Sequence, residues 1–157
     1  MNNFTSTVFK PPFDLPPVRH SLFLAGSIEM GKAEDWQTRV ENELKIFPVD
    51  IFNPRRDDWD SSWVQSIKEA NFKEQVMWEL QALERAEYIL MYFDPTTMSP
   101  ISLLELGLHA RTGKLIVVCP DGFWRKGNVD VVCRYYDIRQ YNTLDEAIAF
   151  FRFNFTI

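Results

Sequence analysis

Short apolar runs alternate along this chain with segments whose apolar residues recur at helical spacing. Each run is short enough for a buried strand, and most of the intervening segments are long enough for a helix. We expect strands at residues 21–25, 49–53, 88–93, 114–120 and 136–141. We expect helices at residues 33–47, 67–86, 101–110 and 143–153, with a short helical or irregular stretch near 128–136. This alternation predicts a parallel sheet with helices on both faces.

The expected architecture is an α/β fold with one doubly wound, five-stranded parallel sheet of the flavodoxin or Rossmann-like type. In the common strand order 2-1-3-4-5, the order reverses between the first and third strands, and ligands bind in the crevice beyond that point. The loops to inspect are therefore GSIEMGK, from Gly26, and DPTTMSP, from Asp94. Residues 1–19 contain four prolines and predict an extended N-terminal arm, so we expect a single domain over residues 20–157.

Length and charge argue against several classes of protein. The chain has 157 residues, 46% of them hydrophobic, which is enough for one core and one domain. Its net charge of −5 argues against a nucleic acid polymer or an anionic membrane as the partner. No apolar run approaches the roughly 20 residues of a membrane helix, and no secretory leader is evident. Two cysteines and two histidines form no plausible zinc set, so we expect no metal, reduced thiols and a cytoplasmic protein.

The loop after the first expected strand contains a partial phosphate-binding motif. Residues 26–32 read G-x-x-x-x-G-K, and the run 88–93 followed by Asp94 resembles the strand that ends in the magnesium-binding aspartate of P-loop NTPases. However, Ala33 stands where a Ser or Thr hydroxyl would hold the magnesium ion. Glu29 would also place a carboxylate among amides meant for phosphate oxygens. We therefore interpret the match to this motif as coincidental.

Two glutamates stand at positions that should face the core. On the second expected helix, Glu79 falls within an apolar stripe that includes Val76, Leu80 and Leu83. On the third, apolar residues go nearly all the way around, which predicts burial on most sides, and Glu105 is the only acidic residue. Burying an unpaired carboxylate is unfavourable by several kcal/mol, so each glutamate must be paired, protonated or facing a cavity.

Enzymes that cleave glycosidic bonds typically place two carboxylates in one cavity. One carboxylate can attack the anomeric carbon of a sugar, while the other carboxyl group donates a proton to the leaving group or accepts one from it. The alternative is that either glutamate is a paired structural acid or reaches solvent at a helix end. The residues alone leave both interpretations open.

Three stretches together resemble the nucleoside 2-deoxyribosyltransferase family, in particular its deoxyribosyltransferase-like branch. They are LFLAGSI from Leu22, QVMWELQALERAEYIL from Gln75 and SPISLLELGLHARTGKLIVV from Ser99. The resemblance covers roughly residues 21–135. An E-L-G sequence on the helix after the third strand, combined with a glycine turn after the first, is fairly specific.

The resemblance implies an N-glycosyl (pentosyl) transferase of nucleotide salvage that needs no metal or cofactor. Glu105 matches the family's nucleophile, which attacks C1′ of a 2′-deoxynucleoside and forms a deoxyribosyl ester. Glu79 takes the place of the aspartate that helps to protonate the leaving base. Asn128 matches the asparagine that a neighbouring subunit lends to the 5′ end of the sugar. The expected partners are therefore 2′-deoxynucleosides, nucleobases and further copies of the chain, in a homo-oligomer with shared active sites.

Several positions depart from the better-known transferases of the family. Phe23 stands where they have a tyrosine whose hydroxyl supports the nucleophile, and Ser99 where they have an aspartate. Gly26 would let the backbone turn beside the sugar. Ser27 and Ser99 look more like related hydrolases of 2′-deoxynucleoside 5′-monophosphates, in which serines help to bind the phosphate. Glu29, in place of an arginine of those hydrolases, argues against phosphate.

The loop after the second strand opens near the same crevice and adds candidate binding residues. Asn53 is one candidate, and those that could form a lid that stacks on the base or hydrogen-bonds it are Arg55, Arg56, Asp57 and Trp59. A solvated charged loop is the alternative. Asp94, at the end of the third strand, could contact the sugar or cap a turn before the following proline.

The sequence thus predicts a transferase that moves 2-deoxyribose between nucleobases through a covalent glutamyl ester. Two alternatives stay open. One is a hydrolase of 2′-deoxynucleosides or their 5′-monophosphates, and the other is a non-catalytic nucleotide-binding or sensing module. The balance between transfer and hydrolysis depends on how well the site excludes water while the ester survives.

Overall fold

The computed structural model describes residues 5–16, 20–28 and 35–156, and within these ranges it has six strands and five helices. The strands are β1 (Thr7–Phe9), β2 (Ser21–Gly26), β3 (Asp50–Phe52), β4 (Tyr88–Tyr92), β5 (Leu115–Val118) and β6 (Arg139–Tyr141). The helices are α1 (Trp36–Glu43), α2 (Ala70–Arg85), α3 (Pro100–His109), α4 (Lys126–Tyr135) and α5 (Leu144–Asn154). From β2 onward, strands and helices alternate as the sequence predicts.

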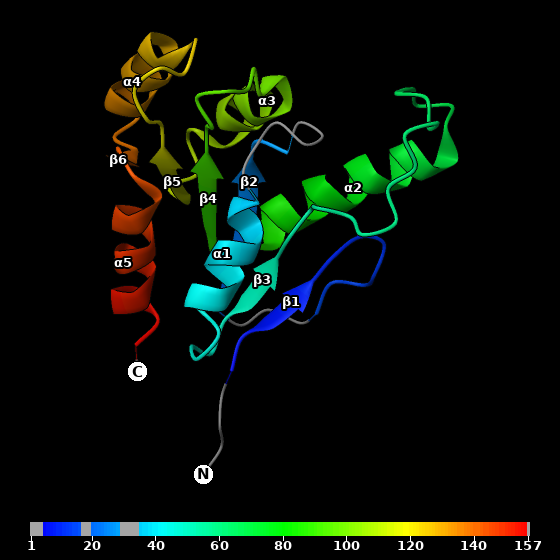
Figure 1. The fold of residues 1–157 in the computed structure, drawn as a ribbon, viewed down its shortest axis with the longest axis horizontal. Coiled ribbons are helices and arrows are strands. Elements are labelled where there is room, and N and C mark those ends of the chain that lie inside the picture. Colours follow the sequence, from blue (N-terminus) through cyan, green and yellow to red (C-terminus); the bar gives the residue numbers. More distant parts are fainter. Residues whose placement is uncertain (1–4, 17–19, 29–34, 157) are drawn as a thin grey trace.

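All six strands are parallel and lie in the order β1-β3-β2-β4-β5-β6 (Figure 1). The five predicted strands are present in the predicted order. The predicted number of strands is wrong by one, because Thr7–Phe9 pairs with Asp50–Phe52 and adds β1 at the edge. This strand comes from the predicted N-terminal arm and has only three residues, too few to show a strand pattern in the sequence. The boundary between an arm and a domain at residue 20 stays a prediction.

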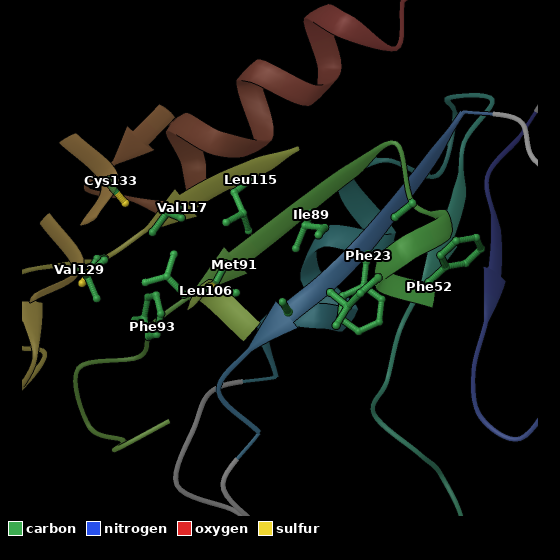
Figure 2. Close-up of a cluster of buried hydrophobic side chains, with 14 of the residues drawn as sticks. Phe23, Phe52, Ile89, Met91, Phe93, Leu106, Leu115, Val117, Val129 and Cys133 are labelled. Carbon is green, nitrogen blue, oxygen red and sulfur yellow. The ribbon is translucent and has the colours of Figure 1, made fainter. Parts of the chain in front are cut away.

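Helices cover both faces of the sheet. α2, α3 and α4 pack on one face, against side chains that include Phe23, Met91 and Val117 (Figure 2). α1 and α5 pack on the other face, against side chains that include Leu24 and Leu90. β4 and β5, like β2, are buried along most of their length. Their sequences are therefore continuous apolar runs rather than alternating ones.

Local signals account for the starts of two helices. Thr143 and Glu146 form a capping box, in which each side chain accepts a hydrogen bond from the other's backbone amide, and α5 begins there. Asp35 precedes α1, and its carboxylate accepts a hydrogen bond from the Thr38 amide. The ambiguous stretch near 128–136 falls largely within α4.

α2 turns a different face to the core from the one that the sequence predicts. Its buried residues include Gln75, Trp78 and Ala82, whereas Leu80, a member of the predicted stripe, is exposed. The stripe is therefore rotated around the helix axis. Because of this rotation Gln75 is buried on the side of α2 that faces the sheet, a position that the sequence did not predict for it.

α3 buries one face and exposes the other. Its inward face consists of Ser102, Glu105, Leu106 and His109. Its outward face is more than half exposed at three large apolar residues, Ile101, Leu104 and Leu108. The prediction of burial on most sides is therefore wrong for the single chain, since no described element covers the outward face.

The carboxyl ends of β2 and β4 lie side by side where the strand order reverses. The loops that follow these strands leave the same edge of the sheet. The loop between β3 and α2, residues 53–69, leaves that edge too (Figure 1). Side chains from three loops and from the helices after them can therefore meet there. Among the described helices, none is both long and apolar enough to cross a membrane.

Candidate active site

Gly26 ends β2 at a point where β2 and β4 are too close for a side chain. Its φ angle is +146°, and a Cβ atom would lie 2.3 Å from the Tyr92 carbonyl oxygen and 2.9 Å from Cζ2 of Trp36. Only glycine fits here without displacement of a strand. The close approach brings the next residue, Ser27, against the loop that follows β4.

Three buried hydroxyl groups meet beyond Gly26. Thr97 Oγ1 lies 2.8 Å from Ser27 Oγ and 2.8 Å from Ser99 Oγ, and the two serine hydroxyls contact each other. The Asp94 amide donates to Ser27 Oγ at 3.0 Å, and the Thr97 hydroxyl donates to the Asp94 carbonyl at 2.9 Å. The cluster joins the loops after β2 and β4, and it brings the predicted residues Ser27 and Ser99 together.

Ser99 lies immediately before α3 in a left-handed backbone conformation, with φ 46° and ψ 53°. A residue with a Cβ atom is strained there by about 1–3 kcal/mol. Hydrogen bonds between its hydroxyl and those of Ser27 and Thr97 hold the conformation, and Pro100 begins the helix with a φ angle suited to it. The turn sets the direction in which α3 leaves the sheet, and hence the place of Glu105.

Glu105 on α3 and Glu79 on α2 are neighbouring carboxyl groups, of which Glu105 is buried and Glu79 is partly buried. Glu105 is 8% exposed. Burial raises the pKa of Glu105 to about 8, and the neighbouring charge of Glu79 adds to the rise. Burial raises the pKa of Glu79 to about 7, although a hydrogen bond from Gln75 acts in the opposite direction. Two negative charges in this space repel each other, so between pH 7 and 8 the pair holds about one proton.

Gln75 contacts Glu79 from one turn earlier on α2. Its Nε2 donates to Glu79 Oε1 at 2.9 Å and to the Pro54 carbonyl at 3.0 Å. Gln75 is buried, and its Oε1 has no hydrogen-bond partner in the described part of the chain. Through Gln75, the Glu79 carboxyl is therefore connected to the start of the loop after β3.

Asn53 and Arg55 are held against α1 and the residue before it. Asn53 is buried, and its Nδ2 donates to Glu41 Oε1 at 2.6 Å. Arg55 Nη1 contacts Asp35 Oδ1 at 2.9 Å and Gln37 Oε1 at 3.2 Å. Because α1 packs on the face of the sheet opposite to α2 and α3, these contacts do not direct the two side chains to the carboxyl pair.

Asp57 and Trp59 lie farther along the same loop. Asp57 is exposed and forms an ion pair with Lys10 of β1's flanking segment, at 2.9 Å. The Trp59 ring packs edge-on against Trp63, with 5.1 Å between ring centres. The loop therefore has packing of its own, and none of these contacts involves the carboxyl pair.

Asp94 and Phe23 make contacts that shape the loop and the core. Asp94 Oδ1 accepts hydrogen bonds from the Thr96 amide at 2.8 Å and from the Thr96 hydroxyl at 2.6 Å, so it caps the turn after β4. Phe23 is fully buried, with its ring centre 6.4 Å from that of Trp78. In this structure Phe23 is part of the core beneath α2, and its side chain has no hydroxyl group to offer.

Asn128 is exposed near the start of α4. Its exposure is suited to a contact with another molecule. His109 is buried on the inward face of α3, one turn beyond Glu105. Desolvation lowers the pKa of His109, and nearby Lys114 acts in the same direction, so the ring is neutral at pH 7.

The sequence analysis missed two residues that the structure places at the site, Gln75 and Thr97. Gln75 precedes Glu79 by four residues, so a helical projection puts both on one face, and this was the available signal. Thr97 offered none, because its hydroxyl reaches the cluster only through the fold of an irregular loop.

The partial phosphate motif is described only at its start. Gly26, Ser27 and Ile28 are described, whereas Glu29, Lys32 and Ala33 lie outside the described residues. Within the described ranges, no three side chains of His, Cys, Asp or Glu gather as a metal site. Cys119 and Cys133 are free thiols buried in the core.

A hollow of about 520 Å³ lies away from the carboxyl pair, between residues 12–15 and the outer side of α2. Trp78 and Arg85 are among its walls. The Trp78 Nε1 donates to the Phe13 carbonyl at 2.8 Å and keeps the N-terminal segment against the helix. None of the described residues that line this hollow is a predicted site residue. The chemistry of the carboxyl pair, rather than the size of a hollow, therefore marks the candidate site.

Comparison with known proteins points to the same part of the chain. A family model described as nucleoside 2-deoxyribosyltransferase like matches residues 19–123. The match includes Glu79 and Glu105 and ends before Asn128. A search of curated proteins gave no match.

Proposed function

Because the chain belongs to the nucleoside 2-deoxyribosyltransferase-like family, we propose that it transfers 2-deoxyribose from a 2′-deoxynucleoside to another nucleobase. The observation that carries this proposal is the pair of neighbouring carboxyl groups on α2 and α3, whose pKa values are both raised by burial. Glu105 and Glu79 are neighbouring desolvated carboxyls that share about one proton near neutral pH, and in the free protein that proton favours Glu105, which has the higher pKa. Covalent cleavage of a glycosidic bond requires one ionised and one protonated carboxyl at once.

In the proposed first step, the shared proton passes from Glu105 to Glu79 in the complex with substrate, and the Glu105 carboxylate attacks C1′ of the sugar. Glu79 gives its proton to a ring nitrogen of the base, the C1′–N bond breaks, and the neutral base leaves. The sugar remains as an ester on Glu105. In the second step, a nitrogen of the acceptor base attacks C1′, its proton passes to Glu79, and the C–O bond of the ester breaks. The pair thus returns to holding one proton.

The unequal roles of the two carboxyls follow from the charge that develops during the reaction. As the C1′–N bond stretches, positive charge grows on the sugar next to Glu105 and stabilises its carboxylate. The shared proton is then held by Glu79, close to the leaving base. A pKa of Glu79 near 7 suits an acid that must give up its proton and take it back near neutral pH.

The hydroxyl cluster favours a second candidate function, hydrolysis of 2′-deoxynucleoside 5′-monophosphates. Ser27, Thr97 and Ser99 gather three hydroxyl groups at the carboxyl ends of β2 and β4. Hydroxyl groups that exchange their present partners can donate to phosphate oxygens, or to the 5′-hydroxyl of an unphosphorylated sugar. The cluster therefore supports recognition of the 5′ end in both candidate functions.

We also propose that the active form is a homo-oligomer. The outward face of α3 carries Ile101, Leu104 and Leu108 on the helix whose inward face carries Glu105. Contiguous exposed apolar residues of this kind mark interaction surfaces. A second copy on this face would lie beside the site, where Asn128 of one chain could serve the site of its neighbour.

The proposal is tested by chromatography of the purified protein with 2′-deoxyinosine and adenine, beside the Glu105→Gln and Glu105→Ala variants. We expect 2′-deoxyadenosine from the wild type alone. Hypoxanthine and free 2-deoxyribose without exchange would instead identify a hydrolase, and 2′-deoxyinosine 5′-monophosphate is then the next substrate. If the wild type leaves nucleosides and monophosphates intact but binds them, and Glu105→Ala binds them equally well, the protein is a binding module.

A further inference from the structure

The amide of Gln75 has only one orientation that satisfies its neighbours. Its Nε2 lies 3.0 Å from the Pro54 carbonyl oxygen and 2.9 Å from Glu79 Oε1. A carbonyl oxygen can accept a hydrogen bond but cannot donate one, so the NH2 group of Gln75 must face Pro54. The second hydrogen of the same NH2 group is then directed at Glu79 Oε1.

This orientation determines which oxygen of Glu79 can carry a proton. Oε1 faces an N–H donor and must act as an acceptor, so a proton on Oε1 would oppose the hydrogen of Gln75. We propose that Gln75 is a positioning residue that fixes the Glu79 carboxyl and keeps its proton on Oε2. The inference rests on the proposed function, in which that proton passes to the leaving base.

Packing alone does not account for a glutamine at this position. Gln75 is 5% exposed, and its Oε1 has no hydrogen-bond partner in the described part of the chain. A buried acceptor without a partner is unfavourable, and methionine would fill the same volume without one. The two hydrogen bonds of Nε2 are therefore the feature that an amide provides here and an apolar side chain does not.

A comparison of two substrates separates positioning of the proton from general support of the fold. The base of 2′-deoxyguanosine needs a proton to leave, whereas N7-methyl-2′-deoxyguanosine already carries a positive charge on its base and needs none. A displaced acid should therefore slow the first substrate and spare the second. We expect Gln75→Met to lower kcat for 2′-deoxyguanosine about 10- to 100-fold, and for the methylated substrate less than about 3-fold.

Two controls accompany this comparison. Gln81→Met makes the same substitution at an exposed position of α2 and should leave both rates unchanged. Thermal unfolding checks that the Gln75→Met variant folds. If it does not fold, Gln75→Asn is used in its place, because asparagine keeps the amide but is too short to make both hydrogen bonds. Equal losses on both substrates would overturn the inference and leave the proposed function intact.

A titration decides the inference if the wild type fails to turn over either substrate. A wild-type protein that turns over neither nucleoside would count against the proposed function. The effect of Gln75 on Glu79 can then be measured without turnover, as a change in the pKa of Glu79. The NMR chemical shift of the Glu79 carboxyl carbon, followed against pH, reports the protonation of this group. The titration of Glu79 is coupled to that of Glu105 on α3, its charged neighbour. The hydrogen bond from Gln75 lowers the pKa of Glu79, so Gln75→Met should raise it. An unchanged titration curve would overturn the inference.

Discussion

Replacing Glu105 by glutamine removes a buried ionisable group and keeps its size and shape. In the folded chain the pKa of Glu105 is about 8, compared with an ordinary value of 4.5. As the pH rises above about 4.5, the unfolded chain releases this proton while the folded chain keeps it. The stability associated with Glu105 is therefore complete below pH 4.5 and is lost progressively up to about pH 8.

The size of this effect follows from the difference between the two pKa values. Each pH unit within the window changes the free energy of unfolding by about 1.4 kcal/mol. At pH 7 the accumulated loss is about 3 kcal/mol relative to a side chain that does not ionise. We therefore expect Glu105→Gln to match the wild type near pH 4, to exceed it by about 3 kcal/mol at pH 7, and to gain little beyond pH 8.

Urea unfolding followed by tryptophan fluorescence, repeated from pH 4 to pH 8.5, measures this difference. Glu84→Gln, at an exposed position of α2, is the matched control and should change stability by less than about 0.5 kcal/mol at every pH. A stability difference that does not vary with pH would refute the argument. So would a Glu105→Gln variant that is less stable than the wild type at pH 8, because it would mean that the folded chain favours the charged form.

Three further predictions concern the surroundings of the pair. Gly26→Ala should lower the free energy of unfolding by about 2–4 kcal/mol, because its Cβ would overlap the Tyr92 carbonyl, and a loss below about 0.5 kcal/mol in urea unfolding would contradict this. Leu104→Asp should reduce the proposed oligomer to monomers in light scattering, whereas Phe153→Asp, at an exposed position of α5, should not; equal sizes for both variants would exclude the α3 interface. Ser27→Ala should lower stability by about 1–3 kcal/mol. If the 5′-monophosphate is the substrate, Ser27→Ala should also raise KM for it more than for the nucleoside, and equal changes would contradict a phosphate role.

The parts of the fold that depend on local pattern could be predicted from the sequence. The five predicted strands are present in the predicted order, and the clearest signals came from β2, β4 and β5, which are central strands buried on both faces and therefore read as apolar runs. Glu105 could be placed near the core because it is the one acidic residue on a largely apolar helix. In both cases the signal lies within a single segment of the chain.

The rest depends on contacts between segments that lie far apart in sequence. Asn53 and Arg55 follow β3 as expected, but their partners are supplied by α1 and the residue before it. The outward face of α3 is apolar and yet exposed in the single chain, so its composition alone could not distinguish it from a face that packs against the core. The left-handed conformation of Ser99 arises from a hydroxyl cluster whose other members lie in two loops.

The electrostatics of the carboxyl pair favour a functional role for Glu79 and Glu105 over a purely structural one. A structural acid in a core is stabilised by a cation or by several donors, whereas Glu105 forms no ion pair within the described residues and has another carboxyl as its charged neighbour. Glu79 has a single amide donor among those residues, which lowers its pKa less than burial raises it. Glutamine at position 105 would be more stable above pH 5 by the reasoning given above. An arrangement that opposes folding above pH 5 and yet keeps a shared proton on two neighbouring carboxyls fits the proposed reaction, which needs one carboxylate and one acid.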